Sequence, residues 1–231
     1  LAEPEIGLFI VADGMGGHAG GDTASRMAVT LIRQRLLRAR QNGSFFVGNF
    51  SRQDDGQILQ LLDAAVREAS GRIFELSSRR PELEGMGTTT TLLLVHGLKG
   101  YVAHVGDSRL YRLRQGRFEL LTEDHSLVNE QVKAGFLTKE EAARSRFSNI
   151  ITRSVGFEAE VTPDVFHFDL RPGDLFLICS DGLNGMLEDE QIAAILRSQP
   201  PAAAVGALVS EANRAGGDDN ISVVLVRTGR A

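Results

Sequence analysis

The sequence has only one cysteine, so a disulfide within the chain is excluded and a reducing compartment is expected. No apolar run approaches the ~20 residues that cross a bilayer. The N-terminus also lacks the basic and then apolar order of a signal peptide. Basic residues are not in excess, since the net charge is −5, and we expect no nucleic-acid partner. These absences together predict a cytoplasmic protein with no membrane segment.

The length and composition fit one globular domain over residues 1–231. Of the 231 residues, 42% are hydrophobic and 24% are charged, which is ordinary for a folded domain with a sizeable core. A glycine-rich loop at 14–21 is expected to precede a helix capped by Asp22 or Thr23. Apolar patterns predict strands at 6–12, 88–95, 101–105, 110–113, 118–121, 165–169, 174–180 and 221–226, and helices at about 23–40, 57–77, 126–134, 138–144, 188–197 and 201–215.

Short turns join the strands between residues 88 and 122, so we expect one antiparallel series there. Helix pairs alternate with these strands along the chain. That order predicts a layered α+β fold, with sheets inside and helices outside.

Acidic residues stand at the ends of the predicted buried strands. Asp13 and Asp181 each follow an apolar strand and precede a glycine, and Asp219 comes just before the last strand. Asp107 lies in the turn at 106–109. Any one of them has an ordinary explanation, because Asp-Gly is a favoured turn dipeptide.

As a group, these carboxylates would repel one another strongly unless a cation neutralised them. Oxygen ligands without a His or Cys cluster select a hard cation such as Mg²⁺ or Mn²⁺. Two such ions can activate a water and neutralise a phosphate. The sequence therefore offers a metal site as the alternative to a set of unrelated turns.

An ordered set of motifs covers nearly the whole chain, from residue 11 to residue 221. It resembles the signature of bacterial protein phosphatase 2C (PPM) enzymes, and the ordered set is far more specific than any one motif. The motifs are Val11-Ala-Asp-Gly-Met-Gly-Gly-His18, Gly20-Gly21, Ala24-Ser25, Gly87-Thr-Thr-Thr90, Val105-Gly-Asp-Ser-Arg109, Asp124-His-Ser-Leu127, Ser180-Asp-Gly-Leu183 and Gly217-Asp-Asp-Asn-Ile221.

The resemblance implies a four-layer α-β-β-α sandwich, in which helix pairs flank two antiparallel sheets. It implies that Asp13 bridges two Mn²⁺ or Mg²⁺ ions, that the Gly14 carbonyl binds one of them, and that Asp181 and Asp219 complete the protein ligands. Asp107 would hold a weaker third ion. A metal-bridging water would attack the phosphorus of phosphoserine or phosphothreonine without a phosphoenzyme.

His18 is the candidate catalytic side chain. Histidine titrates near neutral pH, so His18 can protonate the leaving serine or threonine oxygen. The alternative is that it only orders the glycine loop or binds water. We expect structural roles for the other histidines, ion pairs within the fold for Arg109 and Arg153, and a buried position rather than a nucleophilic role for Cys179.

Two features depart from the family pattern. The family begins with a strand that carries an arginine for the phosphate and an Asn-Glu/Gln-Asp motif, and we expect that this N-terminal strand is missing from the sequence at hand. After Asp181, Asn184-Gly185 stands where many members have another acidic residue, which weakens ligation of the third ion. The segment 125–156 corresponds to the flap of bacterial members, a place for substrate selection.

The leading hypothesis is a monomeric serine/threonine protein phosphatase that opposes a bacterial serine/threonine kinase. Its partners would be phosphorylated proteins that are substrates of that kinase, and the kinase itself. The alternative is a pseudophosphatase or regulatory phosphoprotein-binding module that kept the fold and lost turnover. A third possibility is a phosphatase that acts on a partner of the anti-sigma type.

Overall fold

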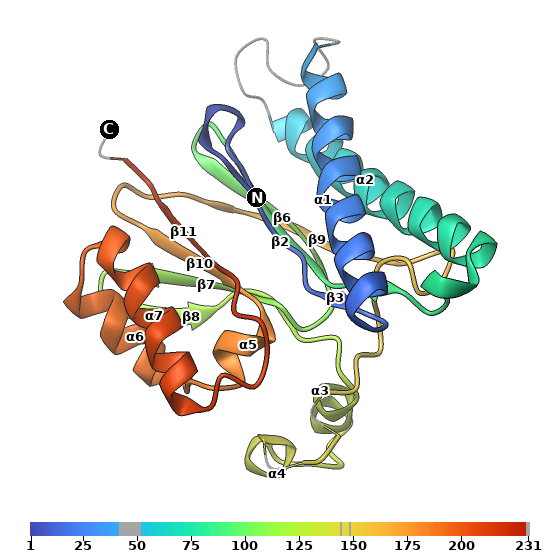
Figure 1. Cartoon of the computed structure of the whole chain (residues 1–231). Helices are drawn as coiled ribbons and strands as arrows, with labels where there is room; N and C mark the ends of the chain where they lie inside the picture. Colours follow the sequence, from blue (N-terminus) through green and yellow to red (C-terminus); the bar gives the residue numbers. More distant parts are fainter. Residues whose placement is uncertain (42–51, 144, 148, 230–231) are drawn as a thin grey trace.

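Two antiparallel sheets are stacked between helices in this computed structural model, which describes residues 1–41, 52–143, 145–147 and 149–229 (Figure 1). The first sheet has the order β1-β2-β5-β6-β9, and the second has the order β11-β10-β7-β8. A two-stranded ribbon, β3-β4, lies beside them. The strands are β1 Ala2–Glu3, β2 Leu8–Val11, β3 Gly14–Met15, β4 Gly87–Thr88, β5 Thr90–His96, β6 Lys99–Val105, β7 Arg109–Arg114, β8 Arg117–Leu120, β9 Asp164–Asp169, β10 Leu175–Cys179 and β11 Val223–Arg227.

The helices form the outer layers. The pair α1 His18–Gln41 and α2 Arg52–Arg79 covers the first sheet, and the pair α6 Asp189–Ser198 and α7 Pro201–Ala215 covers the second (Figure 1). A short helix, α5 Asp181–Asn184, directly follows β10. Helices α3 Leu127–Lys133 and α4 Lys139–Ala143 stand away from both pairs, below the sandwich in this view. The predicted four-layer α-β-β-α arrangement is confirmed.

Alternate residues of each central strand face different cores. Phe9 of β2 lies in the core between the sheets with Phe176 of β10, whereas Leu8 and Ile10 pack toward α1 and α2. On β10, Leu177 packs toward the other helix pair. Because both faces of these strands are covered, they appear in the sequence as continuous apolar runs.

The short connections do not all form hairpins. Strands β6 and β7 belong to different sheets, so the turn at 106–109 crosses from one sheet to the other. The same holds for the turn at 171–174, between β9 and β10. The expectation of one antiparallel series through residues 88–122 is therefore wrong at this point. The crossing places Asp107 at the edge of the sandwich, between the sheets.

Helix α1 begins at His18, not after the predicted cap at Asp22 or Thr23. The glycines that suggest a loop instead permit a close approach between the helix and β3. A Cβ at Gly14 would lie 2.0 Å from the carbonyl oxygen of Gly21, which is too close for any side chain there. The contact fixes the chain just after Asp13.

None of the helices in the described part of the chain combines the length and apolar character needed to cross a membrane.

Candidate functional site

The structure brings the four predicted acidic side chains to one edge of the sandwich. Asp181 acts on the Asp13 carboxyl group both through charge and at a separation that permits a hydrogen bond when one carboxyl is protonated. Asp219 and Asp107 act on Asp13 through charge. Burial, followed by these neighbours, raises the pKa of Asp13 to about 8. Burial raises the pKa of Asp107 to about 7, with smaller effects from Asp181 and Asp124. Negative charge is thus disfavoured here unless a cation is present.

The chemistry of this edge fits hard cations. The Oδ1 atom of Asp181 is buried and has no hydrogen-bond partner, which is costly for a carboxylate without a ligand. Within the described residues, no three Asp, Glu, His or Cys side chains form a ready-made cage around one point. Mg²⁺ and Mn²⁺ do not require such a cage, because these ions keep several waters and need few protein ligands each. The unpartnered Oδ1 of Asp181 is therefore the observation that fits a hydrated cation at this edge.

Three hydrogen bonds fix the backbone of Asp13 to a neighbouring threonine run. The Thr88 hydroxyl and the Thr89 N–H both donate to the Asp13 carbonyl oxygen at 2.8 Å. In return, the Asp13 N–H donates to Thr89 Oγ1 at 2.9 Å. The Thr89 hydroxyl also contacts Ser108 Oγ at 2.8 Å, next to Asp107. The sequence signal for this support is the run of four threonines at 88–91, which by itself predicts only a β-branched strand.

A buried serine joins the chain segments that carry Asp181 and Asp219. The Ser180 hydroxyl donates to the carbonyl oxygen of Asn220 at 3.0 Å and accepts from the N–H of Ser222 at 3.0 Å. Asp219 itself is exposed, and its Oδ1 accepts from the N–H of Asn220 at 2.7 Å. The two segments, 40 residues apart in sequence, thus share one hydroxyl group.

His125 has the structural role that the sequence predicted. Its Nδ1 accepts from the Gly106 N–H at 3.1 Å, and its backbone N–H donates to the Gly106 carbonyl at 2.8 Å. The Nε2–H can then donate to Asp164 Oδ2, which lies 3.1 Å away. Ser126 caps α3 by accepting from the Asn129 N–H at 3.4 Å. His125 therefore supports the sheet-crossing turn that carries Asp107.

His104 predicts how stability depends on pH. It is fully buried, with Nε2 at 2.9 Å from the Glu123 carbonyl and Nδ1 at 2.9 Å from Thr91 Oγ1. A neutral ring with its proton on Nε2 donates to the Glu123 carbonyl, and its Nδ1 shares the single Thr91 hydroxyl proton with the Ser108 carbonyl, which lies 2.9 Å from Thr91 Oγ1. Burial and then His125 lower its pKa to about 4. The unfolded chain binds a second proton on the His104 ring more readily than the folded protein does. The contribution of neutral His104 to the free energy of unfolding is therefore fully present above about pH 6.5 and is lost as the pH falls toward 4.

Between pH 7.5 and pH 5, we expect His104 to account for a loss of about 2 kcal/mol in the free energy of unfolding. Urea unfolding of wild type and His104→Gln at both pH values measures this loss. The variant, although less stable at pH 7.5, should lose correspondingly less between the two values. Equal losses in the two proteins would contradict the assignment of this pH dependence to His104.

The structure describes the side chains of three further residues singled out in the sequence, but not the side chain of His18. Cys179 is fully buried, and burial raises the pKa of its thiol to about 12, so it is no nucleophile. Arg109 and Arg153 pair with Asp124 and Asp164, as predicted. His18 begins α1, but its side chain lies outside the part of the chain whose side chains are described. Its catalytic role stays a prediction.

The comparisons with known proteins agree with this geometry. The family model described as protein phosphatase 2C matches residues 2–216, a range that ends just before Asp219. Protein phosphatase PhpP of Streptococcus pneumoniae is 40% identical over 227 residues, which cover 95% of this chain and 85% of that protein.

Two solved structures are also similar to the chain. The crystal structure of the Mycobacterium tuberculosis serine/threonine phosphatase PstP/Ppp has a TM-score of 0.84 at 35% identity, covering 96% of this chain and 88% of that one. The catalytic domain of PstP in complex with two manganese ions has a TM-score of 0.79 at 36% identity, covering 94% and 86%. The family match spans most of the chain, and the acidic residues expected from its motifs meet at one edge of the fold; the chain therefore belongs to the protein phosphatase 2C family.

Proposed function

We propose that this chain is a metal-dependent serine/threonine protein phosphatase. The observation that carries the proposal is the buried, unpartnered Oδ1 of Asp181 beside the Asp13 carboxyl group. Asp13, Asp181 and Asp219 would hold two Mn²⁺ or Mg²⁺ ions with the Gly14 carbonyl, and Asp107 a weaker third. The structure of PstP with two manganese ions, in a chain of similar fold, supports this metal content.

The bound ions would supply an activated water and would offset negative charge on the phosphoryl oxygens. The chain's own residues determine where that chemistry takes place. The threonines at 88 and 89 keep Asp13 in position, and Ser180 keeps the segments of Asp181 and Asp219 together. His18 would donate a proton to the leaving serine or threonine oxygen. The burial of Cys179 leaves this edge without a competing thiol nucleophile.

The proposed substrates are phosphoproteins, specifically those of a bacterial serine/threonine kinase and that kinase itself. The names of PstP and PhpP, a serine/threonine phosphatase and a protein phosphatase, support this class. We further propose that the protein acts in the cytoplasm as a monomer. It would have one catalytic domain, with the segment 125–156 serving as a flap over the substrate.

Turnover with and without metal tests the proposal directly. A phosphothreonine peptide and p-nitrophenyl phosphate are offered to the protein in Mn²⁺, in Mg²⁺ and in excess chelator. We expect hydrolysis of both with either ion and none in chelator, with no phosphorylated enzyme trapped on acid quench. A protein that binds Mn²⁺ in calorimetry but hydrolyses neither substrate would instead be a pseudophosphatase or a phosphoprotein-binding module.

A further inference from the structure

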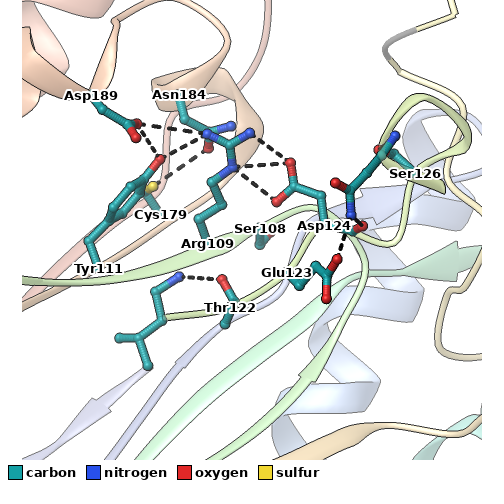
Figure 2. A network of polar contacts seen from close by, with 12 residues as sticks. Ser108, Arg109, Tyr111, Thr122, Glu123, Asp124, Ser126, Cys179, Asn184 and Asp189 are labelled. Carbon is teal, nitrogen blue, oxygen red and sulfur yellow. Dashed lines mark hydrogen bonds and ion pairs between the residues drawn. The ribbon is translucent and has the colours of Figure 1, made fainter. Parts of the chain in front are cut away.

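Arg109 lies at the centre of a polar network beside the acidic edge (Figure 2). It is the first residue of β7 and comes two positions after Asp107. Its guanidinium group makes a bidentate pair with the Asp124 carboxylate: Nε lies 2.9 Å from Oδ1, and Nη2 lies 2.7 Å from Oδ2. Such a bidentate pair fixes direction as well as distance, because the fork and the carboxylate are both planar.

The other side of the guanidinium group reaches the second helix pair. Nη1 of Arg109 donates to the Tyr111 hydroxyl at 2.9 Å, and this hydroxyl donates to Asp189 Oδ1 at 2.8 Å. Asp189 is the first residue of α6, which follows shortly after Asp181 and α5. In Figure 2 the Asp124 and Asp189 carboxylates lie on opposite sides of the guanidinium group. Arg109 thus connects two parts of the chain that are 65 residues apart.

Asp124 stands at the base of the segment 125–156. Both ends of that segment are tied together there: the Leu127 N–H donates to the Ile150 carbonyl, and the Thr152 N–H donates to the His125 carbonyl, each at 2.9 Å. The Asn129 side chain in α3 also donates to the Asp124 carbonyl at 2.7 Å. Whatever orients Asp124 therefore orients the start of α3 and the closed base of the segment.

The segment presents apolar surface that a small phosphate ester would not need. Phe136 is 80% exposed, and Phe147 and Ile150 are more than 40% exposed. Exposed aromatic and branched side chains of this kind suit contact with another polypeptide. Their position relative to the acidic edge depends on how the base of the segment is held.

A stabilising function alone does not account for the network. The Arg109 and Asp124 side chains are 24% and 16% exposed, and buried ion pairs often contribute little net stability because desolvation offsets their attraction. Burial would lower the pKa of Arg109, but the hydrogen bonds that it donates to Asp124 and Tyr111, together with the Asp124 charge, raise it overall, so the guanidinium group stays charged. What the pair supplies is a fixed geometry between β7, α6 and the segment.

We infer that Arg109 is a positioning residue that sets the orientation of the segment 125–156 toward Asp107, and through it the recognition of protein substrates. The inference rests on the proposed phosphatase function for its substrate. In this role Arg109 does not contact the phosphate group of the substrate. Its consequence is that loosening Arg109 should affect a phosphopeptide more than a small ester.

The same strand offers a matched control. Arg114, at the far end of β7, makes an equivalent bidentate pair with Asp174, at 2.7 Å from Nε and 2.5 Å from Nη2. Asp174 is 1% exposed, so this pair is at least as buried. Arg109→Lys and Arg114→Lys each keep the charge and lose the fork. They differ in that only Arg109 contacts the base of the segment.

The experiment compares kcat/KM for a phosphothreonine peptide with that for p-nitrophenyl phosphate in the wild type and both variants. For Arg109→Lys we expect the ratio of the two to fall about tenfold, mainly through the peptide KM, well below the roughly 100-fold that misplacement can cost. For Arg114→Lys the ratio should stay at the wild-type value. Equal ratios in the two variants, with an active wild type, would overturn the inference and leave the proposed function intact.

Hydrogen exchange supplies a readout that does not depend on turnover. Amides of 127–133 should exchange faster in Arg109→Lys than in wild type, whereas Arg114→Lys should leave them unchanged. A wild type inactive toward both substrates would count against the proposed function, while the exchange comparison would still decide the positioning role. Unchanged protection of α3 in Arg109→Lys would refute that role.

Discussion

Replacing Asp13 with asparagine is expected to reduce metal-dependent turnover severely and, at the same time, to stabilise the metal-free protein. Loss of a carboxylate that would hold the metal ions should cost several kcal/mol of transition-state stabilisation, a fall of roughly 1000-fold in kcat/KM with Mn²⁺. Stability should change in the opposite direction, because the Asp13 carboxyl is buried beside Asp181 and near two further acidic groups. Bound cations would favour this negative charge, whereas folding of the metal-free protein does not.

The sign of the stability effect follows from the pKa. The folded-state pKa of Asp13 is raised from 3.8 to about 8, so the metal-free wild type loses stability as the pH rises through this window. Asp13→Asn cannot ionise and should escape this loss. At pH 7.5 in excess chelator, we expect the variant to be more stable by about 1–2 kcal/mol, with solvent screening taken into account.

Urea unfolding in chelator and kinetics in Mn²⁺ measure the two effects on one pair of proteins. Asp63→Asn is the control, because Asp63 makes an exposed ion pair with Arg67 on α2, whereas the carboxyl groups that raise the pKa of Asp13 come from other elements. It should change neither quantity appreciably. If Asp13→Asn were less stable than wild type in chelator, the acidic edge would not be under electrostatic strain. A variant with full turnover would remove Asp13 from the metal site.

The acidic edge could be predicted from sequence because its signal is local. An apolar strand followed by Asp-Gly places a carboxylate where a buried strand ends, and this pattern occurs at both Asp13 and Asp181. The burial of these strands on both faces likewise follows from short-range pattern, because each appears as a continuous apolar run. These features require no knowledge of which strands are neighbours.

The support for that edge could not be predicted, because it depends on contacts between distant parts of the chain. The bond between Tyr111 and Asp189 joins residues 78 apart, and Thr88 reaches Asp13 across 75 residues. No local composition distinguishes these threonines or this tyrosine from ordinary strand residues. The predicted start of the first helix was wrong for the same reason. Gly20 and Gly21 lie at a close tertiary contact inside α1, and sequence alone does not distinguish such glycines from those of a loop.

The turn at 106–109, which crosses between the sheets, also could not be predicted from local sequence pattern. Short turns usually join paired strands, but here the chain leaves the first sheet at Val105 and enters the second at Arg109. Gly106 makes this possible with a φ of +105°, where a Cβ would lie 2.6 Å from Thr89. The crossing brings Asp107 to the edge and Arg109 to the network, so one tertiary feature creates both.

One methyl group at Gly182 is expected to disrupt the join between the Asp181 and Asp219 segments. A Cβ there would lie 2.4 Å from the carbonyl oxygen of Asn220, a backbone atom that no rotamer change can move away. That carbonyl also accepts the Ser180 hydroxyl, so displacing it breaks the bond that holds the two segments together. We expect Gly182→Ala to lower the free energy of unfolding by about 3 kcal/mol, because overpacked backbone contacts relax poorly. We also expect the Kd for Mn²⁺ to rise, as measured by calorimetry on the folded fraction.

Gly206→Ala is the matched control for that change, since Gly206 lies in α7 and a methyl group added there would meet nothing within 4 Å. In a helix interior, alanine should instead stabilise the protein by about 0.5–1 kcal/mol. Urea unfolding of both variants therefore separates the general effect of alanine from the specific contact at Asn220. Opposite signs are expected for the two stability changes. If Gly182→Ala matched Gly206→Ala in stability and bound Mn²⁺ like wild type, the close approach at Asn220 would not be what keeps Asp181 and Asp219 together.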